Sequence, residues 1–221
     1  MEQDFRPGLM ASVRKAIERG TTAAQDEQAG YVWTQSWNSD VFEYRCVFGS
    51  VFSIWFNDFL DKRRNEGKVY ALDLMSTSAM LTGLKIDGGV AVGLGNITNE
   101  LSEEQMRERN ITYIAGNLLK IQPWNSIKDW LGRNNADGFD LITCRANLSG
   151  CHSEYVPRFP SVYYALLDRA WNLLNKNGGV LLVDAPWLIH LEGGIPRELV
   201  NDWLKRLKQA NVECLYKEGT N

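Results

Sequence analysis

Cysteine and histidine are scarce in this chain, and their scarcity argues against several kinds of chemistry. The 221 residues include two histidines and four widely separated cysteines, Cys46, Cys144, Cys151 and Cys214. No two cysteines form a C-x-x-C pair, so the pattern of a zinc site or a redox pair is missing. Cys144 and Cys214 lie in apolar runs, where a cysteine behaves as a small hydrophobic residue. We therefore expect no bound metal and a reduced, cytoplasmic protein.

Long apolar runs and an excess of positive charge are also missing. No apolar run approaches the ~20 residues of a membrane-spanning helix, and the polar start MEQDFRPGLM does not resemble a secretory signal. The formal net charge is −3, whereas a nucleic-acid-binding protein usually presents a basic face. The basic run Lys62-Arg63-Arg64 is interpreted as a solvated helix end. We expect a small-molecule or protein substrate, with neither nucleic acid nor a membrane as partner, and the oligomeric state stays open.

Residues 1–66 form an amino-terminal segment of helices and aromatic side chains. Its clearest element is GSVFSIWFNDFLDKRRNEG, in which Ser50 is a candidate N-cap. Five apolar residues of this run share one face of a helix, which we expect to pack on a sheet: Phe52, Trp55, Phe56, Phe59 and Leu60. The preceding aromatic residues Tyr31, Trp33 and Trp37 allow two interpretations. They form a lid over a ligand, or they pack against this helix.

Residues 67–221 alternate short apolar runs with amphipathic ones. We expect strands at 69–72, closed by Asp73, at 90–94 after a Gly88-Gly89 turn, and at 111–115, 139–144, 180–183 and 212–216. The intervening helices are expected at 78–84, 126–131, 160–175 and 196–210, and a further one carries a capping box from Ser102 to Gln105. Such alternation predicts an α/β fold, a Rossmann-like, doubly wound and mostly parallel sheet with helices on both faces. Ligands of such sheets bind beyond the carboxyl ends of the strands.

In order and spacing, several segments resemble the class I S-adenosylmethionine-dependent methyltransferases. VYALDLMSTSAM is similar to the first strand and turn of that family, and ADGFDLITCRANL to its fourth strand. LLDRAWNLLNKNGGVLLVDAP is similar to the helix, glycine turn and fifth strand that follow. The family's sheet normally ends with an antiparallel strand, which this sequence does not supply. Three explanations are open: an incomplete sheet, a fragment of a longer protein, or a partner that covers the edge.

The resemblance implies a cofactor site for S-adenosylmethionine. Asp73 stands where the family has an acid at the end of the first strand. Ser76 and Ser78 lie in the turn that follows, where the family has glycines because side chains beyond Cβ obstruct the ligand. Small side chains leave this turn partly open, and serine hydroxyls can donate to a carboxylate.

Two later positions of the implied site also differ from the family. Gly95 replaces the acid that takes the ribose hydroxyls, so the neighbouring Asn96 becomes the candidate for that role. A neutral acceptor makes weaker hydrogen bonds than a carboxylate, so we expect a loss of affinity. Asn117 stands where the family's acid accepts from the adenine amino group, and Leu118 is a candidate cover for the adenine.

Residues near the transferred methyl group are expected after the fourth strand. Arg145 stands at the start of that segment and is a further candidate for cofactor binding. Ribose-2′-O RNA methyltransferases would have aspartate near this position, so Arg145 argues against that subgroup. Asn147, His152 and His190 are catalytic candidates, because an amide can orient a substrate and a histidine near its usual pKa can serve as a general base. The ordinary alternatives are a loop-capping asparagine and surface or packing histidines.

The sequence thus leaves two main hypotheses for function. The first is an S-adenosylmethionine-dependent methyltransferase of unknown substrate. The second is a catalytically inactive methyltransferase-like domain that serves as a binding or assembly module. A dinucleotide-dependent oxidoreductase ranks last, because G-x-G-x-x-G does not follow the first strand.

Overall fold

The computed structural model describes residues 50–74, 79–93, 102–116, 118, 120–145, 160–184, 201, 204–205, 207–209 and 212–213. Its helices are α4 (Ser50–Glu66), α5 (Ala79–Gly83), α6 (Glu103–Glu108), α7 (Ile121–Arg133) and α8 (Pro160–Leu173). Its strands are β1 (Tyr70–Leu74), β2 (Gly88–Gly93), β3 (Ile111–Ala115), β4 (Leu141–Arg145) and β5 (Val180–Asp184). None of the described helices is long and apolar enough to cross a membrane.

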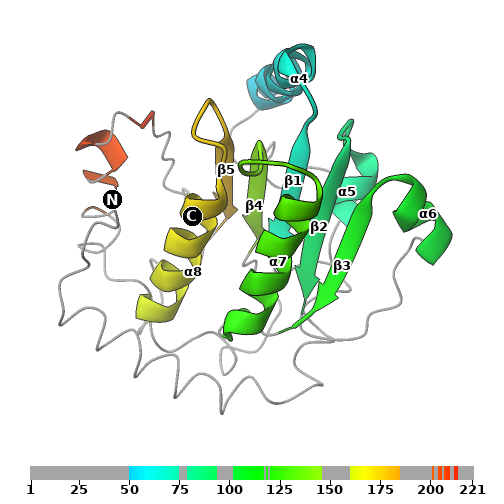
Figure 1. Cartoon of the computed structure of the whole chain (residues 1–221). Coiled ribbons are helices and arrows are strands. Elements are labelled where there is room, and N and C mark those ends of the chain that lie inside the picture. The colour runs from blue at the N-terminus through cyan, green and yellow to red at the C-terminus, as the bar shows by residue number, and fades with distance from the viewer. Residues whose placement is uncertain are drawn as a thin grey trace.

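The described strands form one five-stranded sheet in the order β3-β2-β1-β4-β5, and every neighbouring pair is parallel. All strands therefore end at the same edge, the lower one in Figure 1. The chain builds outward from β1 to β3 and then returns to the other side of β1. This is the Rossmann-like α/β fold that the alternation of strands and helices predicted.

Two apolar clusters cover the two faces of the sheet. On one face, Trp124, Ile127 and Trp130 of α7 and Leu167 and Leu173 of α8 pack on the even-numbered residues of β1 and β4. On the other face, α4 and α5 pack on Ala71 and Leu141. Figure 1 shows α7 and α8 side by side in front of the strands. The fold is therefore a helix–sheet–helix sandwich, as expected for a buried parallel sheet.

The predicted stripe of α4 is only partly buried. Phe52, Phe56 and Leu60 are buried against the sheet, as predicted, whereas Trp55 retains 40% of its exposure and stacks on Phe59. The helix begins at Ser50 itself. Residues before position 50, including Tyr31, Trp33 and Trp37, lie outside the described residues.

The interpretation of Arg63 as part of a solvated helix end was wrong. Its side chain is 12% exposed, and its Nε and Nη2 atoms donate to Asp140 Oδ1 at 3.0 and 2.5 Å. The other oxygen of Asp140 accepts from the backbone N–H of Tyr70 at 2.9 Å, and Asn175 Nδ2 donates to Oδ1 at 3.1 Å. Arg63 Nη1 also donates to the carbonyl of Asn177 at 2.8 Å. This network fixes α4 to the amino ends of the strands.

Glycines at the start of β2 form part of the strand and not the predicted turn. A Cβ at Gly88 would lie 2.5 Å from the side-chain nitrogen of Asn110, and one at Gly89 would lie 2.6 Å from the carbonyl oxygen of Ala71. Close approach of neighbouring backbone, and not chain reversal, explains these two glycines.

Other boundaries agree more closely with the sequence. The capping box of α6 is confirmed, because Ser102 and Gln105 exchange both hydrogen bonds. Helix α7 is longer than the predicted 126–131, since Pro123 is accommodated in its first turn. Residues 201, 204, 205 and 207–209 are helical within the predicted helix at 196–210. Val212 and Glu213 belong to no strand, and the rest of the predicted sixth strand lies outside the described residues.

Candidate functional site

Strand order reverses between β1 and β4, at the centre of the sheet. From β1 the chain continues to β2 on one side, and after β3 it returns to β4 on the other. The connections that leave β1 and β4 therefore diverge, which opens a crevice beyond their carboxyl ends in folds of this type. This reversal point locates the candidate site before any side chain is considered.

A buried polar pair lies directly at the reversal. Asp73 of β1 and Thr143 of β4 are register partners, and neither side chain is exposed. Thr143 Oγ1 donates to Asp73 Oδ1 at 2.7 Å, whereas its distance of 3.4 Å to the carbonyl of Leu72 is long for a hydrogen bond. Asp73 is the next-to-last residue of its strand and does not close it. A carboxylate thus lies one residue below the predicted crevice, held by a hydroxyl group from the neighbouring strand.

The ends of β2 and β3 are built from small residues. Gly93 and Ala115 are register partners at the last position of each strand. The N–H of Gly116 donates to the carbonyl of Gly93 at 2.7 Å, so the two backbones stay paired one residue further. A Cβ at Gly116 would lie 2.6 Å from Cγ of Pro123, so this glycine also lets α7 pack close to the end of β3.

The chain after β3 is held by side chains of two helices. Trp124 Nε1 of α7 donates to the carbonyl of Leu118 at 2.7 Å, and Arg169 Nη1 of α8 lies 3.4 Å from the same oxygen. The guanidinium of Arg169 also lies 5.6 Å from the ring centre of Trp124, and partial burial lowers the pKa of Arg169. The side chain of Leu118 is buried in the core cluster of this face. Its predicted contact with an adenine therefore stays a prediction.

Three of the predicted site residues lie within the described part of the chain. Asp73, Leu118 and the backbone of Arg145, which pairs with Asp184 at the end of β4, are described. The remaining candidates lie outside the described residues: Ser76, Ser78, Gly95, Asn96, Asn117, Asn147, His152 and His190. Of the described candidates, Asp73 and Arg145 lie on the two strands between which the order reverses, and Asp73 is the acid of the pair.

Sequence reasoning missed Thr143, Trp124 and Arg169. Thr143 is the one polar residue within the apolar run LITC, and a hydroxyl inside a buried strand was a signal that it has a specific partner. Trp124 and Arg169 gave no such signal, because their contacts depend on how α7 and α8 pack side by side.

At the opposite end of the sheet, the described residues hold the network of Arg63 and Asp140 and a polar hollow. A polar hollow there is lined by Asp61, Arg64, Asn65, Gly67 and Asp87. Asp87 Oδ2 already accepts from the N–H of Val69 at 2.8 Å, so this carboxylate serves the chain itself. Across the described part of the chain, no group of three or more His, Cys, Asp or Glu side chains is placed to hold a metal ion.

No protein-family model matches the sequence, and no curated protein matches it. The candidate site therefore depends on the strand order and the buried pair at its centre.

Proposed function

We propose that the protein is an S-adenosylmethionine-dependent methyltransferase that acts on a small molecule or a protein. The observation that carries the proposal is the buried Asp73 at the reversal between β1 and β4. Asp73 lies near the point where ligands bind in such sheets, and it is the one acid of the implied cofactor site that the sequence retains. The cytoplasmic location inferred from the cysteines is part of the same proposal.

The chemistry of Asp73 fits the charge of the proposed cofactor. S-adenosylmethionine carries a positive sulfonium and a positive amino group, and a carboxylate in a poorly hydrated position attracts positive charge more strongly than one in water. Thr143 holds one oxygen of Asp73 at 2.7 Å, which fixes the direction of the carboxylate. Since Asp73 is fully buried, it contributes charge from below the crevice.

Bound S-adenosylmethionine would supply an already activated methyl group, so the protein needs little acid–base chemistry. Its own residues would hold the donor and the acceptor in line and exclude water. Asn96 and Asn117 are proposed to take the ribose and the adenine, and Asn147, His152 and His190 remain candidates to orient the acceptor. The strands that lead to the positions of Asn96 and Asn117 end in Gly93 and Ala115, two small residues that add no side-chain bulk beyond Cβ.

A binding or assembly module without catalysis is the second candidate. It is favoured by MSTSAM, where a glycine-rich turn is expected, and by Gly95, where an acid is expected. Both changes weaken the binding of a nucleoside, but neither alters the strand order of the sheet.

Calorimetric titration of the full chain with S-adenosylmethionine and S-adenosylhomocysteine tests the proposal. We expect both ligands to bind, and we expect Asp73→Asn to weaken the first more than the second, because only the first carries the sulfonium charge. One unit charge about 8–15 Å away contributes about 1–2 kcal/mol at an effective dielectric constant of about 20, or roughly a 5- to 30-fold difference in affinity.

Asp137→Asn provides the matched control, because Asp137 is exposed in the loop before β4 and should change neither affinity. Circular dichroism of each variant verifies that it is folded. If neither ligand binds at concentrations up to about 1 mM, the methyltransferase proposal is wrong and the inactive module remains.

A further inference from the structure

The first half of α4 is apolar on both of its faces. Phe52 and Phe56 are buried against the sheet, with 6% and 3% exposure. On the other side, Val51 keeps 70% of its exposure, Ile54 65% and Trp55 40%. These three positions follow the i, i+3, i+4 spacing of a second helical face. Exposed apolar side chains that gather on one face of a helix often mark a surface for interaction.

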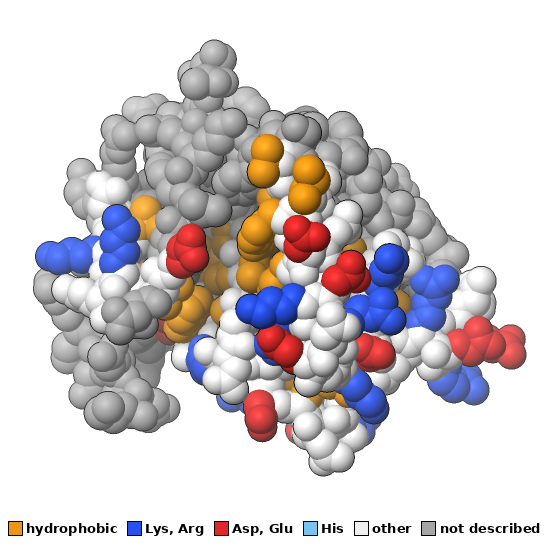
Figure 2. All heavy atoms as spheres, turned by 90° about the horizontal axis from the view of Figure 1, so that it is seen from above, with side chains coloured by type: hydrophobic (Ala, Val, Ile, Leu, Met, Phe, Trp, Pro, Cys, Tyr) orange, Lys and Arg blue, Asp and Glu red, His pale blue; other side chains and the backbone are white. Residues whose placement is uncertain are grey.

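The rings on this helix form a fixed platform. The ring of Trp55 stacks on Phe59 with a centroid separation of 5.9 Å and an interplanar angle of 13°, and it lies 5.6 Å from the ring of Phe52. The first charged residue of α4 is Asp58, so no charge interrupts its first two turns. In Figure 2, hydrophobic side chains gather in the upper middle of the view, and charged side chains crowd below them.

We propose that residues 31–48 of the same chain pack on this second face, formed by Val51, Ile54 and Trp55. The segment leads directly into α4, so it needs only to fold back to reach a face that begins at the first turn. A chain of ten residues spans up to about 33 Å when extended, whereas Val51 and Trp55 are separated by only about 6 Å of helix rise. Its apolar residues include six aromatic ones, Tyr31, Trp33, Trp37, Phe42, Tyr44 and Phe48.

The size of the face favours this occupant over a second copy of the chain. If the full surface of each side chain is about 200 Å², the exposed fractions of the three residues amount to about 350 Å² of apolar surface. A stable interface between proteins buries about 800 Å² on each partner. A face of less than half that size suits a short segment of the same chain, which loses no translational freedom when it docks.

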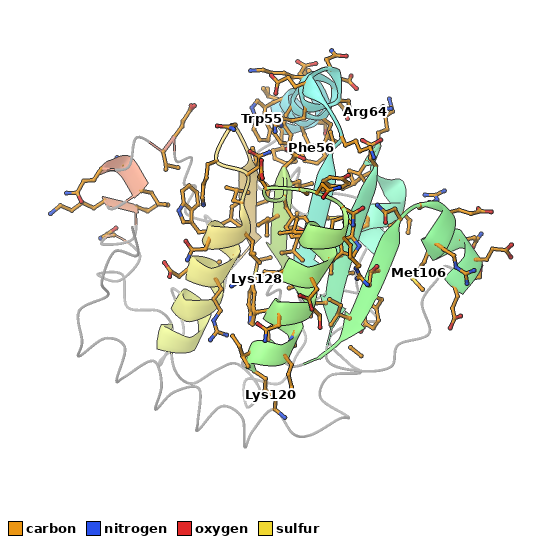
Figure 3. The ribbon with its side chains drawn as sticks, viewed as in Figure 1. Trp55, Phe56, Arg64, Met106, Lys120 and Lys128 are labelled. Carbon is orange, nitrogen blue, oxygen red and sulfur yellow. The ribbon has the colours of Figure 1, made fainter. Side chains whose placement is uncertain are left out.

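The proposed packing favours one of the two interpretations of Tyr31, Trp33 and Trp37. Trp55 lies near the amino ends of the strands, whereas Lys120, which precedes α7, lies at the opposite end (Figure 3). The candidate site is at the end marked by Lys120. Aromatic residues that pack on Trp55 therefore stabilise the fold and do not cover the ligand. This inference does not depend on the proposed methyltransferase activity.

A photo-crosslinking amino acid in place of Ile54 in the full chain tests the proposal, with the same group in place of the exposed Lys128 on α7 as control. We expect crosslinks from position 54 to residues 31–48 of the same chain, and none to this segment from position 128. A mixture of ¹⁴N- and ¹⁵N-labelled protein distinguishes crosslinks within a chain from those between chains. Crosslinks between chains would overturn the proposal and show that a second copy of the chain covers the face. Crosslinks only to other segments, or no crosslinks, would also refute it.

Limited trypsin digestion gives an independent measurement. Ile54→Asp should expose the segment and speed cleavage after Arg45 at least severalfold, whereas Asn57→Asp, at an exposed polar position of the same helix, should leave the rate unchanged. Equal rates for wild type and Ile54→Asp would contradict the proposal.

Discussion

Replacing Asp140 by alanine should remove much of the stability of the protein. Asp140 is 2% exposed and accepts hydrogen bonds from Arg63, Asn175 and the N–H of Tyr70. Its loss leaves the guanidinium of Arg63 without its buried partner, which typically costs about 3–5 kcal/mol. Because Arg63 is 12% exposed, water compensates part of this cost, so we expect about 3 kcal/mol. The total free energy of unfolding of a domain of this kind is only about 5–15 kcal/mol.

Urea unfolding followed by tryptophan fluorescence measures this loss. Glu66→Ala is the matched control, since Glu66 contacts the same arginine at 2.6 Å but is 47% exposed. An exposed pair contributes less than about 1 kcal/mol, so the control should unfold almost as the wild type does. The double variant Arg63→Ala/Asp140→Ala should be less destabilised than the sum of the two single variants. If Asp140→Ala costs no more than Glu66→Ala, the network does not fix α4 to the sheet.

Two further predictions concern packing and pH. Gly116→Ala should destabilise the protein by about 1–3 kcal/mol in thermal unfolding, because the added Cβ would overlap Pro123. Gly132→Ala in α7 should instead stabilise the protein by about 0.5–1 kcal/mol, because the space around Gly132 is open. Equal effects of the two substitutions would refute the packing argument. Burial raises the pKa of Tyr113 from 10.0 to about 12, so the folded state retains a proton that the unfolded state loses. Stability should therefore fall between pH 10 and 12, by about 1–2 kcal/mol after allowance for solvent screening, and Tyr113→Phe should reduce this fall in pH-dependent urea unfolding.

Much of the fold follows from local patterns in the sequence. The strand Ile111–Ala115 and the capping box at Ser102 were predicted as observed, because both depend on residues close together in the chain. Gly88 and Gly89 were predicted as a turn because the need for glycine comes from Asn110 and Ala71, which no local pattern reveals.

The candidate site was less accessible to such reasoning. The position of Asp73 near the carboxyl end of a buried strand could be predicted, because it follows a run of apolar residues, whereas its role toward a ligand stays a prediction. Its bond to Thr143 depends on the register of two strands that are 70 residues apart in sequence. The ion pair of Arg63 and Asp140 spans 77 residues, and the run of three basic residues suggested solvent exposure instead. The local spacing of residues does not reveal the register of strands that are distant in sequence, nor which distant side chains become partners.

Amide NMR of the ¹⁵N-labelled chain during titration with S-adenosylhomocysteine tests the central claim most directly. The account predicts the largest shift changes at the carboxyl ends of the strands, at Leu74, Gly93 and Ala115. Gly67 and Asp140, at the amino ends, should change little and serve as internal references. Changes confined to the amino ends, or no changes at saturating ligand, would contradict a nucleoside site at the reversal between β1 and β4.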